Sequence, residues 1–214
     1  MSRLLAALLV VTFASSAEPA LGASRVIVAF GDSLTAGLGL SPEEAYPALL
    51  EARLAHEGYD YRVVNAGVSG DTSAGGLRRI DWALKLGPEI VIVALGANDG
   101  LRGLPPTAMR DNLLAIVQRA RNAGARVLLA GMQLPPNYGT SYARSFEKVF
   151  ADVAQTARVP LIPFLLEGVG GEARLNLPDG IHPNAEGQRR IAEHVWPYLQ
   201  PLLTKTRTPR GAAR

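Results

Sequence analysis

The chain has 214 residues, of which 48% are hydrophobic and 19% are charged, and its formal net charge is +3. This length and apolar content are sufficient for one domain with a substantial core, and no repeat of fixed period divides the chain. Four cations lie in the last ten residues, and without them the chain carries a net charge of −1; they are Lys205, Arg207, Arg210 and Arg214. A near-neutral body without a basic stripe gives no reason to expect nucleic acid as a partner.

The first 23 residues have the pattern of a secretory signal peptide. Arg3 precedes an apolar run over residues 4–13, small residues follow, and either Ala17 or Ala23 could end the signal. The run is shorter than the roughly 20 apolar residues that span a bilayer, so we expect no stable membrane insertion. We therefore predict an exported protein, periplasmic or secreted. Its domain would cover residues 24–202, followed by a basic disordered tail over residues 203–214.

The chain contains no cysteine and three histidines. The absence of cysteine excludes disulfides, cysteine nucleophiles and thiolate metal sites. No His-Glu-x-x-His sequence occurs, and neither of the glycine-rich phosphate-binding patterns stands between a predicted strand and a predicted helix. We therefore expect neither a metal nor another cofactor, and a nucleotide-binding domain is disfavoured. The sequence indicates no oligomeric state.

Short apolar, β-branched runs alternate with amphipathic segments along the chain. The runs are mostly non-alternating, which predicts strands buried on both faces, at residues 25–30, 61–65, 90–95, 126–130 and 161–164. The amphipathic segments have three or four turns, at residues 45–57, 76–86, 107–123, 142–157 and 185–199. Five alternations of strand and helix predict an α/β fold with a five-stranded parallel sheet between two layers of helices.

Polar residues and glycines follow the predicted strands, where ligands bind in sheets of this kind. Ser33 follows the first strand, Gly67 the second and Asn98 the third. Each also has an ordinary interpretation. Ser33 could cap a helix, Gly67 could be a loop glycine, and Asn98 begins an Asn-Asp-Gly turn signal.

One of the three histidines stands out by its neighbours. His56 and His194 lie on amphipathic segments and have the pattern of ordinary helical residues. His182 follows Asp179 by three residues in a segment flanked by two prolines. A carboxylate there can accept from Nδ1–H and leave Nε2 as a base. The alternative is a turn followed by Asn184 as a helix N-cap, which an isolated Asp-x-x-His would favour.

Taken together, these residues match an acyl-transfer site, which needs a nucleophile, a base, a group that orients the base, and donors for an oxyanion. They lie in four blocks, FGDSLTAG (30–37), NAGVSGDTSAGG (65–76), LGANDGLRG (95–103) and LPDGIHPNAEG (177–187). In these blocks the sequence resembles the GDSL or SGNH hydrolases, especially the thioesterase I and arylesterase-like bacterial members. The resemblance covers nearly all of residues 25–202.

The resemblance implies a three-layer α/β/α fold of flavodoxin-like type and a function. Ser33 would be the nucleophile, His182 the base and Asp179 its partner. The oxyanion hole would combine the backbone N–H of Ser33, the backbone N–H of Gly67 and the side chain of Asn98. A small-molecule acyl ester or thioester would be cleaved through an acyl-enzyme, as by an arylesterase, acyl-CoA thioesterase or lysophospholipase.

Two other functions stay open at this point. Family members with the same triad remove acetyl groups from carbohydrates, and fold-level analogy does not separate these substrates. A non-catalytic envelope protein that binds acyl or glycan ligands is the second alternative. A complete set of Ser33, Asp179 and His182 argues against it, because a pure binder does not need these three groups.

Apolar residues near the predicted rim are candidates for substrate contacts. Leu101 and Leu104 follow Asn98, and Leu134 lies in the segment after the fourth predicted strand. Apolar walls suit an acyl or aryl group of medium or large size. In the resembling thioesterases the first of these loops moves over bound substrate. Ordinary loop packing is the alternative interpretation.

Overall fold

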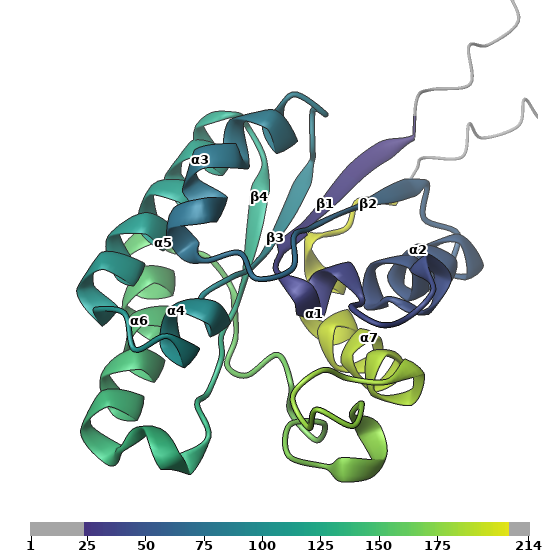
Figure 1. Ribbon diagram of the computed structural model, residues 1–214. Helices are drawn as coiled ribbons and strands as arrows, with labels where there is room; N and C mark the ends of the chain where they lie inside the picture. Colours follow the sequence, from purple (N-terminus) through teal and green to yellow (C-terminus); the bar gives the residue numbers. More distant parts are fainter. Residues whose placement is uncertain (1–23, 206–214) are drawn as a thin grey trace, which may run out of the picture.

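The computed structural model describes residues 24–205. The predicted signal peptide and residues 206–214 of the predicted tail lie outside the described residues. A twisted sheet stands between two layers of helices (Figure 1). The predicted three-layer α/β/α fold with a five-stranded parallel sheet is therefore confirmed.

The sheet has the strand order β2-β1-β3-β4-β5, with every neighbouring pair parallel. This is the flavodoxin-like, doubly wound order. The strands are β1 (Arg25–Gly31), β2 (Tyr61–Gly67), β3 (Ile90–Ala94), β4 (Arg126–Ala130) and β5 (Leu161–Ile162). The helices are α1 (Ser33–Ala36), α2 (Tyr46–His56), α3 (Ser73–Leu84), α4 (Ala97–Leu101), α5 (Pro106–Asn122), α6 (Thr140–Ala157) and α7 (Ala185–Leu199).

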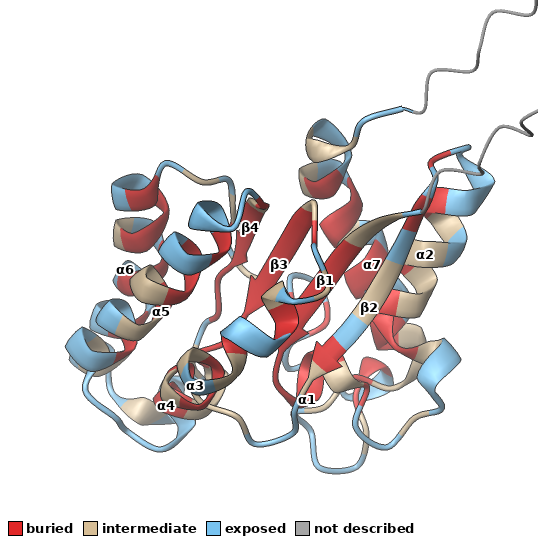
Figure 2. Ribbon diagram, turned by 90° about the horizontal axis from the view of Figure 1, so that it is seen from above, coloured by how far each residue is buried: buried red, intermediate tan, exposed pale blue. Residues whose placement is uncertain are grey.

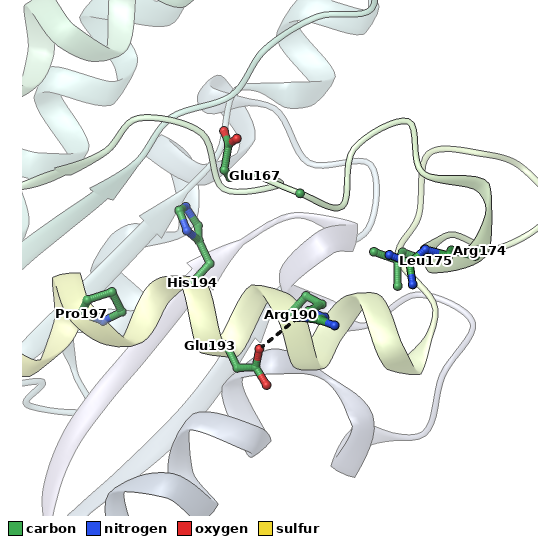
Figure 3. Close-up of a pocket in the computed structure, with 8 residues that line it drawn as sticks. Glu167, Arg174, Leu175, Arg190, Glu193, His194 and Pro197 are labelled. Atoms are coloured by element: carbon green, nitrogen blue, oxygen red, sulfur yellow. Dashed lines mark ion pairs between the residues drawn. The ribbon is translucent and has the colours of Figure 1, made fainter.

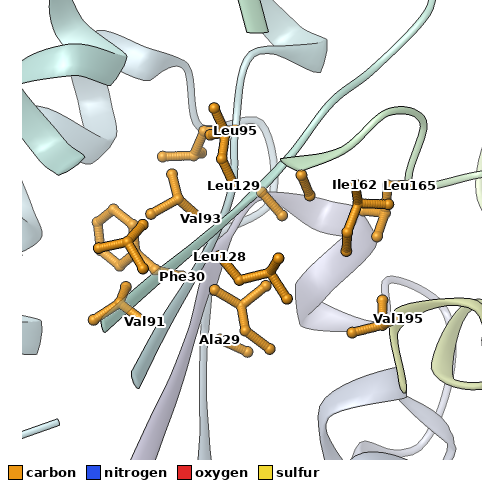
Figure 4. Close-up of a cluster of buried hydrophobic side chains, with 14 of the residues drawn as sticks. Ala29, Phe30, Val91, Val93, Leu95, Leu128, Leu129, Ile162, Leu165 and Val195 are labelled. Atoms are coloured by element: carbon orange, nitrogen blue, oxygen red, sulfur yellow. The ribbon is translucent and has the colours of Figure 1, made fainter. Parts of the chain in front are cut away.

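The helices divide between the two faces of the sheet. Helices α3, α5 and α6 cover one face, and α2 and α7 cover the other (Figure 1). The three central strands β1, β3 and β4 are almost entirely buried, whereas the outer sides of the helices are exposed (Figure 2). Side chains such as Phe30, Val93, Leu128 and Ile162 form the core around these strands (Figure 4).

Two strands differ from their prediction. Strand β2 is an edge strand in which Arg62 and Asn65 are exposed, so the expectation of burial on both faces is wrong for it. Strand β5 has two residues rather than four. It ends where Pro163 follows, because proline has no N–H with which to continue the ladder. The short helices α1 and α4 were not predicted, because four or five residues are too few to show a helical period.

The packed chain continues beyond the predicted domain boundary at residue 202. Leu203 packs against the core, and the N–H of Thr204 donates to the hydroxyl of Tyr61 over 3.2 Å. No helix within residues 24–205 has the length and apolar character needed to cross a bilayer.

A buried glutamine connects α7 to the two helices near the start of the chain. Gln188 is 1% exposed; its Oε1 accepts from the N–H of Tyr46, and its Nε2 donates to the carbonyl of Leu34. The donor–acceptor distances are 2.9 and 3.1 Å. Both partners are backbone groups, at the start of α2 and in α1. The side chain thus fixes α7 against α1 and α2.

We expect Gln188→Met to lower the free energy of unfolding by about 2–4 kcal/mol, because it leaves two buried backbone groups without partners at a cost of about 1–3 kcal/mol each. Urea unfolding measures this change. Arg189→Met on the same helix is the control, because Arg189 pairs with Glu186 at the surface and its loss should cost less than about 1 kcal/mol. Equal stability of the two variants would show that the Gln188 contacts contribute little.

Candidate active site

Ser33 is the first residue of α1, directly after the carboxyl end of β1. Asp32 caps this helix, because its carboxylate accepts from the N–H of Leu34 over 3.0 Å. The helix ends after one turn at Gly37, whose φ of 74° is in the left-handed region that favours glycine. The N–H of Ser33 has no hydrogen-bond partner among residues 24–205. The hydroxyl and the N–H of Ser33 are therefore presented together at the edge of the sheet.

The structure brings His182 to Ser33 across 149 positions of sequence. Nε2 of His182 lies 3.0 Å from Oγ of Ser33, and Nδ1 lies 2.7 Å from Oδ2 of Asp179. The alternative interpretation of the Asp-x-x-His segment as a turn followed by a helix cap is confirmed, because Asn184 caps α7 through the N–H groups of Glu186 and Gly187. The turn and the cap are what place the imidazole between the carboxylate and the hydroxyl.

Asp179 is held in its ionised form. Its Oδ1 accepts from the N–H groups of His182 and Ile181, both at 3.0 Å. These two bonds, together with the ring of His182, lower the pKa of Asp179 to about 2. The carboxylate is therefore charged at neutral pH and fixes the proton of His182 on Nδ1, leaving Nε2 free to accept the proton of Ser33.

Asn98 reaches the same place from the third strand. It lies in the first turn of α4, and its Nδ2 donates to Oδ2 of Asp32 over 3.3 Å, which leaves the second amide hydrogen unused. The next residue, Asp99, is buried and accepts from both the N–H and the hydroxyl of Ser73 at 2.7 and 2.6 Å. This contact with the start of α3 holds the short helix α4 and hence Asn98.

Asp32 is a second acid beside Ser33, in an environment opposite to that of Asp179. It is 1% exposed, and burial raises its pKa to about 6 although the bonds from Leu34 and Asn98 oppose this shift. Its carboxylate caps α1 through the N–H of Leu34 and accepts from Asn98, so its contacts at this turn are structural. Because its pKa is about 6, the carboxyl group of Asp32 gains or loses its proton close to neutral pH.

Gly67 does not present a free N–H, which corrects the expectation drawn from the sequence. Its N–H donates to Oδ1 of Asn65 over 3.0 Å, and Asn65 Nδ2 donates in turn to the carbonyl of Thr35. Gly67 is needed for packing instead. A Cβ there would lie 2.3 Å from the backbone nitrogen of Ala36 and 2.8 Å from the carbonyl oxygen of Asp32.

Gly70, three residues further on, has the free N–H that Gly67 lacks. The N–H of Asp71 donates to the carbonyl of Val68, which closes a turn with Gly70 at its third position and with a φ of 79°. The N–H of Gly70 has no hydrogen-bond partner among residues 24–205. Its carbonyl accepts from Arg102, which directly follows α4, so this turn is tied to the helix that carries Asn98. The glycine in Ser-Gly-Asp was the sequence signal for this turn.

The three leucines predicted to contact substrate are placed differently from one another. Leu101 and Leu104 are partly exposed, and the hydroxyls of Tyr138 and Tyr142 donate to their carbonyls at 3.1 and 2.8 Å. Leu134 is half-buried and packs beside Gly100, against α4.

Three further exposed apolar side chains lie beside site residues, and sequence reasoning missed them. Leu38 follows α1, Val68 follows β2, and Ile181 precedes His182. Single apolar residues in loops are unremarkable in a sequence. In the structure all three side chains are exposed.

A surface hollow along α7 is separate from these residues. It has a volume of about 500 Å³ (Figure 3). Its lining includes Glu167, Arg174, Arg190, Glu193 and His194, and none of the predicted site residues. The hydrogen-bond partner of His194 lies outside the site, because its Nε2 is 3.0 Å from the carbonyl oxygen of Phe164. Within the described part of the chain, no three His, Asp or Glu side chains are grouped as around a metal ion.

The chain is similar to known proteins over most of its length. The profile of the GDSL-like Lipase/Acylhydrolase family matches residues 29–190. Esterase TesA of Pseudomonas aeruginosa is 51% identical over 85% of this chain and 90% of its own. Thioesterase 1/protease 1/lysophospholipase L1 of Escherichia coli K12 is 41% identical over 85% of this chain and 86% of its own.

The fold comparison agrees with the sequence comparison. A crystal structure of TesA superposes with a TM-score of 0.82 and 51% identity, covering 84% of this chain and 100% of that one. The chain therefore belongs to the GDSL-like lipase/acylhydrolase family and has the α/β fold of the SGNH esterases.

Proposed function

We propose that the protein hydrolyses carboxylic esters or thioesters through an acyl-enzyme formed on Ser33. The observation that carries this proposal is the continuous contact from Asp179 through His182 to Ser33, at 2.7 and 3.0 Å. This is the geometry of a nucleophile, a base and an orienting acid. The relatives described above are named as an esterase and as a thioesterase and lysophospholipase. Enzymes of all three kinds attack the carbonyl carbon of an acyl group.

The reaction follows from the contacts. Oγ of Ser33 attacks the carbonyl carbon while its proton passes to Nε2 of His182, and the charge of Asp179 stabilises the imidazolium. The tetrahedral intermediate collapses when His182 gives the proton to the leaving oxygen or sulfur. Water then attacks the acyl-enzyme and loses a proton to Nε2, and His182 returns this proton to Oγ of Ser33 as the acid leaves.

We infer that the oxyanion is held by the N–H of Ser33, the free amide hydrogen of Asn98 and the N–H of Gly70. The first and the third have no partner among residues 24–205, which supports their role as donors to a substrate. Gly70 takes the place that the sequence assigned to Gly67, because the N–H of Gly67 is already bound to Asn65. Three preorganised donors would stabilise the charge that develops on the carbonyl oxygen.

The substrate class that fits is a small-molecule ester or thioester with an apolar acyl or aryl group. Support comes from the exposed apolar side chains beside the site residues: Leu38, Val68, Leu101, Leu104 and Ile181, together with half-buried Leu134. A carbohydrate O-acetyl esterase would need little of this apolar surface. We further propose, from the sequence of residues 1–23, that the protein is exported to the periplasm or secreted.

Hydrolysis of p-nitrophenyl esters with acyl chains of two to sixteen carbons tests the function. We expect turnover that rises from the acetyl ester to longer chains, because the rim is apolar, and we expect Ser33→Ala to reduce it by more than about 10⁴-fold. An optimum at the acetyl ester would favour deacetylation of carbohydrates. A folded protein that hydrolyses none of the esters would support the binding role instead.

A structure of the protein treated with an alkyl phosphonate ester tests the oxyanion donors. We expect phosphorus bonded to Oγ of Ser33, with one phosphoryl oxygen about 2.7–3.2 Å from the nitrogens of Ser33 and Gly70 and from Nδ2 of Asn98. The same oxygen within that range of the Gly67 nitrogen, with Asn65 turned away, would contradict the assignment of Gly70.

The raised pKa of Asp32 predicts a pH dependence of stability. The folded protein binds this proton more tightly than the unfolded chain, because the pKa is about 6 when folded against an ordinary 3.8. The stability from this group is complete below about pH 4 and is lost as the pH rises through 6. At about 1.4 kcal/mol per pKa unit, the loss is about 3 kcal/mol.

We therefore expect the free energy of unfolding of Asp32→Asn, relative to the native protein, to rise by about 2 kcal/mol between pH 4 and pH 7, which is most of this loss. Urea unfolding at a series of pH values measures this difference, in which other titrating groups cancel. Asp60→Asn removes an exposed carboxylate and is the control. A difference that stays constant across this range would show that Asp32 is not the group concerned.

A further inference from the structure

Arg79 of α3 binds three separate segments of the chain at the edge of the sheet that carries Ser33. Its Nη2 donates to the carbonyl of Gly31 over 2.7 Å, and its Nη1 donates to the carbonyl of Ala66 over 2.8 Å. Its Nε donates to Oδ2 of Asp71 over 2.6 Å. These partners are the last residue of β1, the next-to-last residue of β2 and the last residue of the turn that contains Gly70.

The surroundings hold this guanidinium in one place. The side chain of Arg79 is 19% exposed and that of Asp71 is 12% exposed. The guanidinium carbon lies 4.0 Å from the centre of the buried ring of Phe30, which adds a cation–π contact. A Cβ at Gly75 would lie 1.7 Å from Oδ1 of Asp71, so this glycine leaves the space that the carboxylate occupies.

The partners of Arg79 are next to the groups that the mechanism uses. Gly31 precedes Ser33 by two residues, and Asp71 directly follows Gly70. The carbonyl of Gly31 also accepts from the N–H of Val68, the first residue of the turn, at 3.0 Å. Arg79 therefore connects the strand that ends before Ser33 with the turn that presents the N–H of Gly70.

We propose that Arg79, paired with Asp71, is a positioning residue that sets the separation between the backbone donors of Ser33 and Gly70. This role rests on the proposed function, because it matters where an oxyanion is bound. Arginine suits it for a geometric reason. Its planar fork can donate to two carbonyls and a carboxylate at once, whereas the single nitrogen of a lysine cannot take all three positions.

Such a residue affects the transition state more than substrate binding. Of the six apolar side chains proposed to hold the acyl group, only Val68 belongs to this turn, so KM should change little when the donors are displaced. The oxyanion forms in the transition state, and small displacements of groups that hold it reduce turnover by up to about 100-fold. A residue that acts through stability alone would lower the melting temperature without changing the kcat of the folded enzyme.

The test uses Arg79→Gln and Arg79→Lys in the full chain, assayed with the best p-nitrophenyl ester at a temperature where far-UV circular dichroism matches the native protein. Titration to completion with a phosphonate ester counts the reactive Ser33. Per titrated site, we expect kcat to fall about 10- to 100-fold in both variants, with KM within about threefold of the native value. The affinity for a trifluoromethyl ketone, whose adduct with Ser33 carries an oxyanion, should fall by the same factor as kcat.

Arg119→Gln is the matched control. Arg119 also donates to a carboxylate and to a carbonyl, those of Asp81 and Leu77, but both partners lie on α3 and not at the strand ends. Its kcat should stay within about twofold of the native value.

The proposal is overturned if kcat per titrated site stays within twofold of the native value in the folded Arg79 variants. It is also overturned if kcat of Arg119→Gln falls by the same factor as kcat of the Arg79 variants. If Arg79→Gln does not fold, Arg79→Lys decides. A native protein that neither hydrolyses esters nor reacts with the phosphonate overturns the proposed function itself, whereas an active native protein with unaffected Arg79 variants overturns the positioning role alone.

Discussion

Helix α1 lies directly on the ends of β1 and β2, closer than any side chain would allow. The two strands end in register at Gly31 and Gly67. A Cβ at Gly31 would lie 2.0 Å from Oγ1 of Thr35 and 2.8 Å from the carbonyl oxygen of Ala94, and Gly67 is similarly enclosed by α1. At Gly67 this contact is backbone against backbone, and at Gly31 it involves the side chain of Thr35 and the backbone of Ala94. The position of Ser33 is therefore set by the close packing of α1 on the two strand ends, and the other groups of the site are placed relative to it.

Two carboxyl groups near this helix have opposite pKa shifts because their environments differ. Asp179 lies in an open loop and accepts from two N–H groups, which favours its charged form. Asp32 is enclosed by protein, and its neutral form is favoured up to about pH 6. The first can oppose the positive charge of an imidazolium, and the second caps α1 and accepts from the amide of Asn98.

Much of the fold could be predicted because its signals are local. Buried strands and amphipathic helices leave a period in the sequence, and α7 begins and ends at the predicted residues. Strand β2 was misjudged because its apolar residues look like those of a central strand, while its edge position depends on the strand order. Helix α3 begins three residues before its predicted start, because Gly75 and Gly76 weaken the helical signal there.

The site was predictable as a set of residue types but not as a set of bonds. Ser33, Asp179 and His182 meet as the resemblance implied. Whether Gly67 or Gly70 has a free N–H depends on which of them binds the side chain of Asn65. This contact is visible only in the folded structure. The same holds for Arg79, whose three partners lie 8, 13 and 48 positions away in sequence, two of them on different strands.

The imidazole and the hydroxyl that it meets are 149 residues apart. The base arrives in the last loop before α7, whereas the hydroxyl is on the first turn after β1. A growing or partly folded chain thus carries a serine of ordinary reactivity until nearly the whole sheet and both helical layers are in place. Ester cleavage consequently requires the chain to have folded as far as His182, and a shortened chain that ends before Asp179 lacks both the base and the carboxylate that orients it.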